Sequence, residues 1–479
     1  MNFVCDIVEA FAPDRRALVA IDHEGRRSEH TFGEVCDRSA RLAGTLTAHG
    51  VGPGDVVLTL IGSTPDWVHA MLACFRIGAV ALPCNEMLRA RDLRLRIEAS
   101  DPKLILAGPR DLDELAAARP GCLVLTVGDE ALYDAEPAAA ADLDGDDPCL
   151  IVFTSGSTGE PRGVVHRQTY LPSQILQAQA WFGAPEGELA WCTAATGWSK
   201  SARNAFIAPW MCNAAAMLHD ARFDAEQRLD LIEREGVAAI CMAPTEYRVI
   251  AKRAGLRPLP GLRSMVAAGE ALNPEILHLW REATGVDVRD GYGQTETGHL
   301  TANRPGEPAR PGSMGRPLPG IDLWLQDGEI VVDPATVPTF FLRYLDGEPA
   351  PRGPWHTGDR AHADGDGHLF FESRADDMII SSGYRIGPFE VESALVGHPA
   401  VAEAAVVSAP DDERGAVVRA VVVLRAGIEP GDGLVAELQD HVRTVTAPYK
   451  YPRIIEFAEE LPKTASGKVR RAELRGATG

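Results

Sequence analysis

Apolar runs and amphipathic stretches alternate over the first part of the chain. Residues 55–60 and 79–82 are short apolar runs that predict buried strands, and residues 32–50 and 66–77 carry apolar positions at helical spacing. Gly50 closes the first of these helices, as glycine commonly does. This strand–helix–strand order predicts a parallel sheet.

The same alternation returns after residue 220. Strands are predicted at 237–242, 262–268 and 286–289, and helices at 224–235, 244–254 and 274–284. Asn273 and Pro274 have the residue types of a helix N-cap and first turn. The last strand is predicted to end at Arg289, before the polar segment Asp290-Gly291-Tyr292-Gly293, so this half of the chain predicts further βα units.

The pattern changes twice towards the C-terminus. From about residue 305 the chain is rich in proline and glycine with short strand-like runs, which predicts a small β subdomain. Beyond residue 376 it predicts a strand at 378–381, a helix at 388–397, strands at 401–407 and 416–424, and a helix at 433–445. These elements are typical of a separate, compact α+β domain.

The most informative polar segment follows a predicted strand at 150–153. It contains Thr154, Ser155, Gly156, Ser157, Thr158, Gly159 and Arg162. Glycines allow the backbone to approach a ligand, and hydroxyl groups with a guanidinium complete a cradle for phosphate oxygens. The spacing differs from a Walker loop. The segment indicates a polyphosphate site, most simply for ATP, with an ordinary surface loop as the alternative.

Composition narrows the class of function. The net charge is −21, which argues against non-specific nucleic-acid binding. Nine cysteines occur without a CxxC pair, which favours reduced thiols in a cytoplasmic protein. The N-terminus has no basic segment typical of a signal peptide, and no apolar run approaches the length of a membrane span.

Six motifs occur in a fixed order. The glycine-hydroxyl loop is followed by Asp290–Gly298, Trp355–Asp359, Arg374–Asp377, Ser382–Gly387 and Pro462–Lys468. In this order they resemble the adenylate-forming (AMP-binding) superfamily over nearly the whole chain. Gly197-Trp198, Ser381–Glu392 and Ala447–Pro452 are most similar to medium-chain acyl-CoA synthetases.

The resemblance implies an α/β fold in two parts. A large N-terminal domain, residues 1–375, would contain two doubly wound parallel-type sheets and a small β-barrel subdomain. Residues 376–479 would form a small, mobile α+β lid domain. The implied reaction joins a carboxylic acid to the α-phosphate of ATP, gives acyl-AMP and pyrophosphate, and then transfers the acyl group to the thiol of coenzyme A.

The resemblance also assigns roles to residues of the reacting centre. Lys468 would bridge the carboxylate and the α-phosphate, Thr295 would contact that phosphate, and Glu296 with Thr158 would hold Mg²⁺, which prefers hard oxygen ligands. A cation is needed because two anions must meet in the first step. A solvated tail lysine and a polar loop are the ordinary alternatives.

Further roles concern the nucleotide and the lid. Asp290, Gly291 and Tyr292 would contact adenine on one side, and Gly269, Glu270 and Ala271 on the other. Asp359 would accept both ribose hydroxyls and Arg374 would contact ribose or phosphate, whereas Asp376 would be the hinge. Gly383 and Arg385 would meet the pantetheine arm of coenzyme A. A core tyrosine and a surface acid in a turn are the alternatives for Tyr292 and Asp376.

The acid itself is less constrained. In acetate-specific relatives a tryptophan occupies the position of Gly293 and shortens the pocket, so glycine here predicts an acid larger than propionate, either medium-chain or aryl. Trp198, Phe206 and Tyr247 are candidate walls. Arg162 replaces the usual lysine, and Ala194-Ala195 stand where medium-chain relatives carry an aspartate.

Three questions stay open at the level of sequence. The acceptor is coenzyme A or, alternatively, a carrier-protein pantetheine or an amine-type nucleophile. A nucleotide-binding regulator without catalysis is disfavoured by the presence of Lys468, Glu296 and Asp359 together. The oligomeric state is not predicted.

Overall fold

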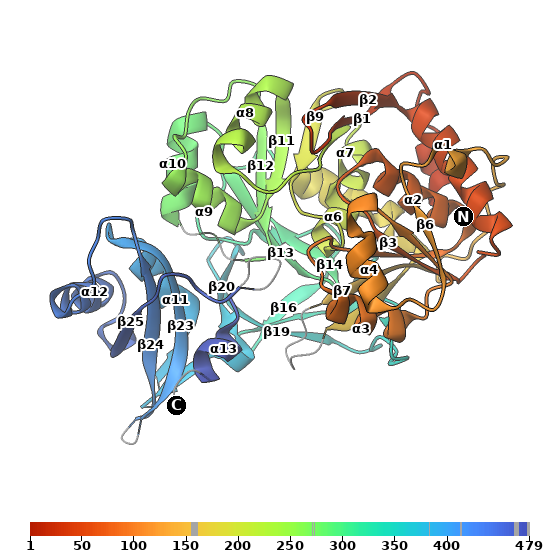
Figure 1. Ribbon diagram of the computed structural model, residues 1–479. Coiled ribbons are helices and arrows are strands. Elements are labelled where there is room, and N and C mark those ends of the chain that lie inside the picture. Colours follow the sequence, from red (N-terminus) through yellow and green to blue (C-terminus); the bar gives the residue numbers. More distant parts are fainter. Residues whose placement is uncertain are drawn as a thin grey trace.

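A computed structural model describes residues 1–154, 161–270, 272, 274–382, 384–411, 414–463 and 469–476, with the backbone alone described for Arg385 and Gly476. Figure 1 shows a large N-terminal part, drawn red to cyan, and a smaller C-terminal part in blue that lies to one side of it. No described helix is both long and apolar enough to cross a bilayer.

Two large sheets organise the N-terminal part, and each is mainly parallel with antiparallel strands at an edge. The first, within the described ranges, has nine strands in the order β15 (Arg316–Pro317), β14 (Gly298–Ala302), β13 (Val288–Gln294), β12 (Ser264–Ala268), β11 (Val237–Met242), β9 (Leu189–Cys192), β10 (Ala215–His219), β1 (Arg16–Ile21) and β2 (Arg27–Thr31). The second has the order β18 (Arg343–Tyr344), β8 (Arg162–Arg167), β7 (Pro148–Thr154), β4 (Val80–Cys84), β3 (Val56–Leu60), β5 (Leu104–Ala107) and β6 (Leu123–Thr126).

Helices cover both sheets, as a doubly wound fold requires. They are α1 (Phe32–Ala48), α2 (Pro65–Ile77), α3 (Ala90–Ser100), α4 (Leu112–Ala118), α5 (Ile175–Gln177), α6 (Ser199–Asn204), α7 (Ile207–Met211), α8 (Ala225–Glu235), α9 (Pro244–Arg253) and α10 (Pro274–Thr284). Apolar side chains of α1 and α2 pack on one face of the second sheet, and those of α3 and α4 on the other. Helices α8, α9 and α10 cover one face of the first sheet.

Local chemistry explains where these helices begin and end. Thr31 caps α1 in a capping box with Glu34, Asp224 caps α8 by accepting from the amide of Gln227, and Pro65 occupies the first turn of α2. The helices and strands predicted by periodicity in this part are therefore confirmed to within a few residues.

One prediction about β13 is wrong. The strand does not end at Arg289 but continues to Gln294, because residues 291–294 pair with the antiparallel strand β14. Glycine makes this pairing possible: a Cβ atom on Gly293 would lie 1.9 Å from the carbonyl oxygen of Gly298. The motif Asp290–Gly293 is thus held in a sheet and is not a loop.

The small β subdomain and the C-terminal part follow. Strands β16 (Leu323–Gln326), β17 (Glu329–Val332), β19 (Trp355–Ala363) and β20 (Leu369–Arg374) form an antiparallel sheet. Beyond it lie β21 (Ile379–Ser381), β22 (Tyr384–Ile386), β23 (Val401–Asp411), β24 (Gly415–Leu424), β25 (Ile454–Phe457), α11 (Pro388–Val396), α12 (Asp432–Val445) and α13 (Arg471–Gly476). The clustered core residues of this part all come from residue 379 onwards, so it has a core of its own.

Candidate active site

The predicted nucleotide residues meet where β13 of the nine-stranded sheet approaches β19 and β20 of the small β subdomain. Tyr292 and Gln294 lie on β13, Asp359 on β19 and Arg374 on β20. Asp359 and Arg374 are direct partners in the antiparallel register of β19 and β20. Segments that are far apart in the sequence therefore bring these polar side chains to one place.

Asp359 is the centre of this group and only 5% of it is exposed. Its Oδ2 accepts hydrogen bonds from the Tyr292 hydroxyl (2.6 Å) and from Nε2 of Gln294 (2.8 Å). Its Oδ1 lies 3.5 Å from Nη1 of Arg374. Burial, followed by the neighbouring carboxylate, holds the pKa of Tyr292 well above its usual range, so the hydroxyl keeps its proton and donates it.

Gln294 extends this network, and sequence reasoning assigned it no role. Besides Asp359, its Nε2 donates to the carbonyl of Thr357 (2.7 Å), and its Oε1 accepts from Nε1 of Trp355 (3.0 Å). The only signal in the sequence was its place inside the motif between Tyr292 and Thr295. We define Tyr292, Gln294, Trp355, Asp359 and Arg374 as the nucleotide wall.

Glu296 lies in the turn after β13, beside half-buried Thr295. Its Oε1 accepts from the hydroxyl of Tyr344 at 3.3 Å, and burial raises its pKa. Arg162 lies over the Tyr344 ring at 3.6 Å and pairs with Asp346 and Glu348. A largely desolvated carboxylate with hard oxygen donors is suited to a divalent cation, which would relieve its burial.

Asp290 lies deeper, at 6% exposure. Its Oδ1 accepts from the amide of Gly291 at 2.8 Å, and burial raises its pKa to about 8. The nearby charge of Lys200 acts in the opposite direction. Lys200 itself donates to the carbonyl oxygen of Ala268, a contact that the sequence did not suggest.

The residues predicted to form the opposite wall follow the end of β12. Gly269 has a φ of +101°, a conformation that favours glycine, and it turns the chain sharply after Ala268. The Oε2 atom of Glu270 accepts from Oγ1 of Thr245 at 2.9 Å. The predicted wall residues Gly269 and Glu270 therefore lie at the carboxyl end of a parallel strand, where α/β sheets bind ligands.

The candidate acid-pocket residues lie in different environments. Trp198 is half-buried and precedes α6. Tyr247 is fully buried in the core, with its ring 5.2 Å from that of Trp280 and its hydroxyl donating to the carbonyl of Val266 (3.2 Å). Phe206 packs against Trp67 and Trp210. Of these three, Trp198 alone keeps a partly open surface.

The predicted hinge lies in an exposed helical turn, η8 (Ala375–Asp377). The carboxylate of Asp376 accepts from Nε of Arg374 at 3.3 Å. The C-terminal part also touches the N-terminal part directly, because Nζ of Lys252 donates to the carbonyls of Val401 (3.2 Å) and Ala402 (3.3 Å). Both contacts are polar, and an apolar contact joins the same two parts, because the rings of Phe371 on β20 and Phe389 on α11 lie 6.2 Å apart.

Several predicted site residues lie outside the described residues: Ser155, Gly156, Ser157, Thr158, Gly159, Ala271, Gly383 and Lys468. Thr154, at the end of β7, is described, and its Oγ1 donates to the carbonyl of Arg162 at 3.3 Å. The backbone of Arg385 lies in β22 opposite Ile380. The roles of all these residues stay predictions.

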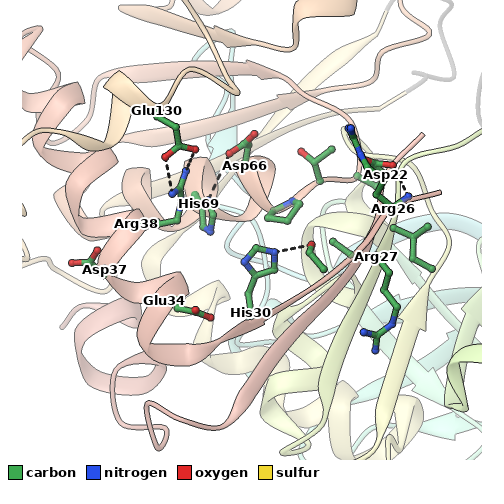
Figure 2. A pocket seen from close by; sticks show the side chains of 16 residues that line it. Asp22, Arg26, Arg27, His30, Glu34, Asp37, Arg38, Asp66, His69 and Glu130 are labelled. Atoms are coloured by element: carbon green, nitrogen blue, oxygen red, sulfur yellow. Dashed lines mark hydrogen bonds and ion pairs between the residues drawn. The ribbon is translucent and has the colours of Figure 1, made fainter. Parts of the chain in front are cut away.

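A cavity of about 740 Å³ lies elsewhere, between the β1–β2 hairpin, α1 and the start of α2. Figure 2 shows two ion pairs among its lining side chains, Arg26 with Asp22 and Arg38 with Glu130. Of the predicted site residues that the structure describes, none lines this cavity. It is therefore not the candidate active site.

The nine cysteines are all within the described part and all are free, as predicted. Cys192 and Cys241 face each other in the register of β9 and β11, and both are buried. No disulfide contributes to the fold or to the site.

Comparison with known proteins agrees with this geometry. The family model described as AMP-binding enzyme matches residues 8–337, and the model of the AMP-binding enzyme C-terminal domain matches residues 390–468. The chain is 40% identical to the uncharacterised acyl–CoA ligase YtcI of Bacillus subtilis, with 97% of this chain and 93% of that protein covered. It is 36% identical to the human mitochondrial acyl-coenzyme A synthetase ACSM4, with 99% and 90% covered.

Solved structures give the same result. A benzoate CoA ligase from Burkholderia xenovorans LB400 superposes with a TM-score of 0.89 at 27% identity, covering 99% of this chain and 100% of that one. The predicted two-part α/β fold is thereby confirmed. Together with the ordered motifs and the nucleotide wall, these matches establish that the chain belongs to the AMP-binding enzymes of the adenylate-forming superfamily.

Proposed function

We propose that this protein is an AMP-forming acid–thiol ligase. It would activate a carboxylic acid with ATP to give acyl-AMP and pyrophosphate, and would then transfer the acyl group to coenzyme A. The observation that carries the proposal is the buried carboxylate of Asp359, held by Tyr292, Gln294 and Arg374 in a chain of the AMP-binding family. A carboxylate fixed in this way is suited to a vicinal diol, which the ribose of ATP provides.

The wall residues act by holding the nucleotide in one orientation. Two oxygens of Asp359 accept from the ribose hydroxyls, the ring of Tyr292 covers adenine, and Arg374 offers charge to ribose or phosphate. Because their hydrogen bonds already exist, little reorganisation is needed when the nucleotide binds. Asp290 and the Gly269–Glu270 turn complete the adenine site.

Glu296, together with Thr158, would hold Mg²⁺. Its oxygens are of the type that Mg²⁺ prefers. Burial raises the pKa of Glu296 and so disfavours its charged form, which a bound cation would stabilise. When bound, the ion neutralises the negative charge of the phosphates during phosphoryl chemistry. Thr295, next to Glu296, offers a hydroxyl to the α-phosphate.

The C-terminal part supplies the remaining residues. Lys468 would stabilise the meeting of carboxylate and α-phosphate in the first step, and rotation at Asp376 would then present Gly383 and Arg385 for the second. The exposed position of Asp376 agrees with such a rotation. We place the boundary between residues 375 and 376 and propose a cytoplasmic location.

Pyrophosphate release tests the proposal directly. A panel of carboxylic acids from C2 to C12 and of aryl acids is assayed with ATP and Mg²⁺, with and without coenzyme A. We expect pyrophosphate release with at least one acid and AMP release that accelerates with coenzyme A. Failure of every acid to release pyrophosphate would contradict the proposal, and product formation only with a holo-carrier protein or an amine would change the acceptor.

The acid is proposed to be larger than propionate. Gly293 carries no side chain that could shorten the pocket, and Trp198 is only partly buried. Tyr247 belongs to the wall of this pocket only if the core around Trp280 opens. The same panel tests chain length, and acetate as the best substrate would refute this proposal.

The role of Lys468 has a separate test. Lys468→Ala should lower acyl-AMP formation by about 10²–10³-fold, the usual effect of removing one donor to developing charge. Thioester formation from supplied acyl-AMP should stay within a few-fold of the wild type. Equal losses in both half-reactions would remove the assigned role.

A further inference from the structure

A second group of polar side chains is buried behind the nucleotide wall, and no role has been assigned to it above. It comes from β8, the turns η4 (Gln168–Tyr170) and η5 (Pro172–Gln174), α5, α6 and β14. We define it as the interior polar cluster; its members are His166, Tyr170, Gln174, Gln177, Arg203, Asn204 and His299. Each of these residues is at most 6% exposed.

Few of these polar atoms have a partner. Nε2 of Gln177 donates to Oδ1 of Asn204 at 2.9 Å, and Nε2 of Gln174 donates to the carbonyl of Tyr170 at 2.9 Å. The atoms without a hydrogen bond include Nε and Nη1 of Arg203, both ring nitrogens of His166 and of His299, and Nδ2 of Asn204. Because nearly all buried polar groups in native proteins are hydrogen-bonded, this concentration points to a missing polar ligand.

Arg203 gives the cluster its charge. Burial, and then the charge of Arg203, lowers the pKa of His166 to about 3, and the same two causes come first in holding the pKa of His299 well below its usual range. Both imidazoles are therefore neutral, and the guanidinium is the cation of the cluster. Among the described residues, the guanidinium interacts with the hydroxyl of Tyr170 and takes part in none of the ion pairs, and its Nε and Nη1 have no hydrogen bond.

The other buried arginines of the described chain differ from Arg203. Arg228 lies 3.7 Å from Glu246, Arg419 forms two hydrogen bonds with Glu456, and Arg289 donates to Ser264 Oγ and the carbonyl of Trp181 at 2.8 Å each. A buried charge without a partner is strongly unfavourable. Of these four arginines, Arg203 and Arg289 have no carboxylate partner among the described residues, but only Arg203 has two guanidinium nitrogens, Nε and Nη1, without a hydrogen bond. An anion supplied from outside the chain would satisfy them.

The position of α6 connects the cluster with the active site. The chain enters the helix at Gly197, whose φ is +87°; a Cβ there would lie 2.5 Å from the amide nitrogen of Asn85, directly after β4. One turn into α6, Lys200 donates to Ala268 at the end of β12. The start of α6 therefore lies beside the carboxyl ends of β4 and β12, one strand from each large sheet.

Arg203 follows Lys200 by three residues, so both side chains lie on one side of α6 and about 4.5 Å apart along its axis. From the other direction, His299 lies against Gly291, the residue before Tyr292 of the nucleotide wall: a Cβ on Gly291 would lie 2.3 Å from Nε2 of His299. A void of about 10 Å³, the size of one water molecule, touches His299 and Gln177. The cluster is therefore adjacent to the predicted acid site on its inner side.

We propose that the interior polar cluster is the distal end of the acid pocket and that Arg203 binds a second carboxylate, so that the substrates are dicarboxylic acids. This proposal rests on the acid–thiol ligase function proposed above. The planar guanidinium matches a carboxylate with two parallel hydrogen bonds, and Asn204 offers a further donor. The carboxylate at the near end would react with ATP, and the one at the far end would fix chain length and orientation.

Matched pairs of acids test the proposal. Pyrophosphate exchange is measured with mono- and dicarboxylic acids of equal carbon number from C4 to C8, and with benzoate and the benzenedicarboxylates. We expect kcat/KM of the wild type to be at least tenfold higher for the preferred diacid than for its monoacid partner. Arg203→Met should lower the diacid value at least 100-fold and leave or raise the monoacid value, with partial rescue in Arg203→Lys.

Arg228→Met is the matched control, because Arg228 is equally buried at 6% but is paired with Glu246. This substitution should change kcat/KM by the same factor for the diacid and for the monoacid. A preference of the wild type for monoacids, or the same acid preference in Arg203→Met, would overturn the proposal while the ligase function stands. If no acid releases pyrophosphate, the proposed ligase function is wrong, and titration calorimetry with the diacids then tests the anion site alone. Binding to the wild type that is lost in Arg203→Met would support the site. Absence of diacid binding to the wild type would refute it.

Discussion

The nucleotide wall and the interior polar cluster are two buried polar regions a few residues apart on β13 and β14, and they differ in how well their polar atoms are satisfied. In the wall, Asp359 accepts from Tyr292 and Gln294 and lies beside Arg374. In the cluster, Arg203 and the rings of His166 and His299 have polar atoms without hydrogen bonds. The wall is preorganised by the protein alone, whereas the cluster is complete only with a ligand.

The difference has an energetic consequence. Breaking a satisfied buried network leaves unpaired groups and destabilises the fold. Removing an unpaired buried charge relieves a penalty and stabilises the fold. Mutations in the two regions should therefore change stability in opposite directions while both lower activity, the wall through ATP and the cluster through the acid.

Asp359→Ala is the strongest test of the wall. It leaves the Tyr292 hydroxyl and the Gln294 amide buried without their shared acceptor, so we expect the free energy of unfolding to fall by about 3 kcal/mol. The kcat/KM for ATP should fall at least about 100-fold, because the ribose loses its acceptor. Urea unfolding and pyrophosphate exchange measure the two effects.

Asp366→Ala is the matched control for that variant, since the carboxylate of Asp366 is exposed and pairs with Arg310 at the surface. It should change stability by less than about 1 kcal/mol. Equal effects of the two substitutions would show that the wall is not a cooperative unit.

Arg203→Met tests the cluster with the opposite expected sign. Without added acid, replacing the unpaired guanidinium with an apolar side chain should raise the free energy of unfolding by about 1–4 kcal/mol. Arg228→Met leaves the carboxylate of Glu246 without its ion-pair partner and should lower the free energy of unfolding by a similar amount. A loss of stability in Arg203→Met would mean that the cluster is satisfied internally, and would remove the contrast with the wall.

Asp290 lies on β13 between the two regions, and Asp290→Asn tests how its burial makes the free energy of unfolding depend on pH. Burial raises its pKa to about 8, so between about pH 4 and 8 the folded protein keeps a proton that the unfolded chain has released. The free energy of unfolding should therefore fall as pH rises through this window, by at most about 1.4 kcal/mol per pH unit. In Asp290→Asn this contribution disappears.

Urea unfolding of wild type and Asp290→Asn from pH 5.5 to 8.5 measures that slope. Asp287→Asn is the control, since its carboxylate pairs with Arg281 near the surface. If the difference in free energy of unfolding between wild type and Asp290→Asn is the same at every pH in this range, Asp290 is ionised throughout. The charge of Lys200 would then have a larger effect on the pKa of Asp290 than its burial has.

Tyr292→Phe should have the smallest effect. It removes one hydrogen bond to Asp359 and keeps the ring, so we expect a loss of stability of about 1 kcal/mol and a rise of the KM for ATP of less than about tenfold. Unfolding curves and initial rates check this. A loss as large as that of Asp359→Ala would mean that the hydroxyl, and not the carboxylate, organises the wall.

Much of the molecule could be predicted from local sequence. Periodicity located α1, α2, α8, α9 and their neighbouring strands, because each buries one apolar face and begins or ends at a residue such as Thr31, Asp224 or Gly50 that suits the terminus. The ordered motifs likewise selected Tyr292, Asp359 and Arg374, which the folded chain brings together, and Glu296, whose role stays a prediction. At these positions the residue type and its neighbours in the sequence are enough to predict the secondary structure or the kind of ligand the side chain suits.

Contacts between distant segments could not be predicted. The hydrogen bond from Tyr292 to Asp359 joins residues 67 positions apart, and the pairing that extends β13 through its motif depends on β14 folding back on it. Whether Arg203 has a partner depends on the side chains that five other segments (β8, η4, η5, α5 and β14) bring to it, and no local sequence pattern contains that information.

The amino-acid sequence by itself therefore determined the family, the βα architecture and the residues available for nucleotide chemistry, since hydrophobic spacing and motif order are properties of the chain alone. Only the tertiary structure decided which polar groups satisfy one another and which do not. The physical reason is that solvation and pairing of a buried charge depend on everything packed around it, and that environment exists only once the sheets and helices have come together.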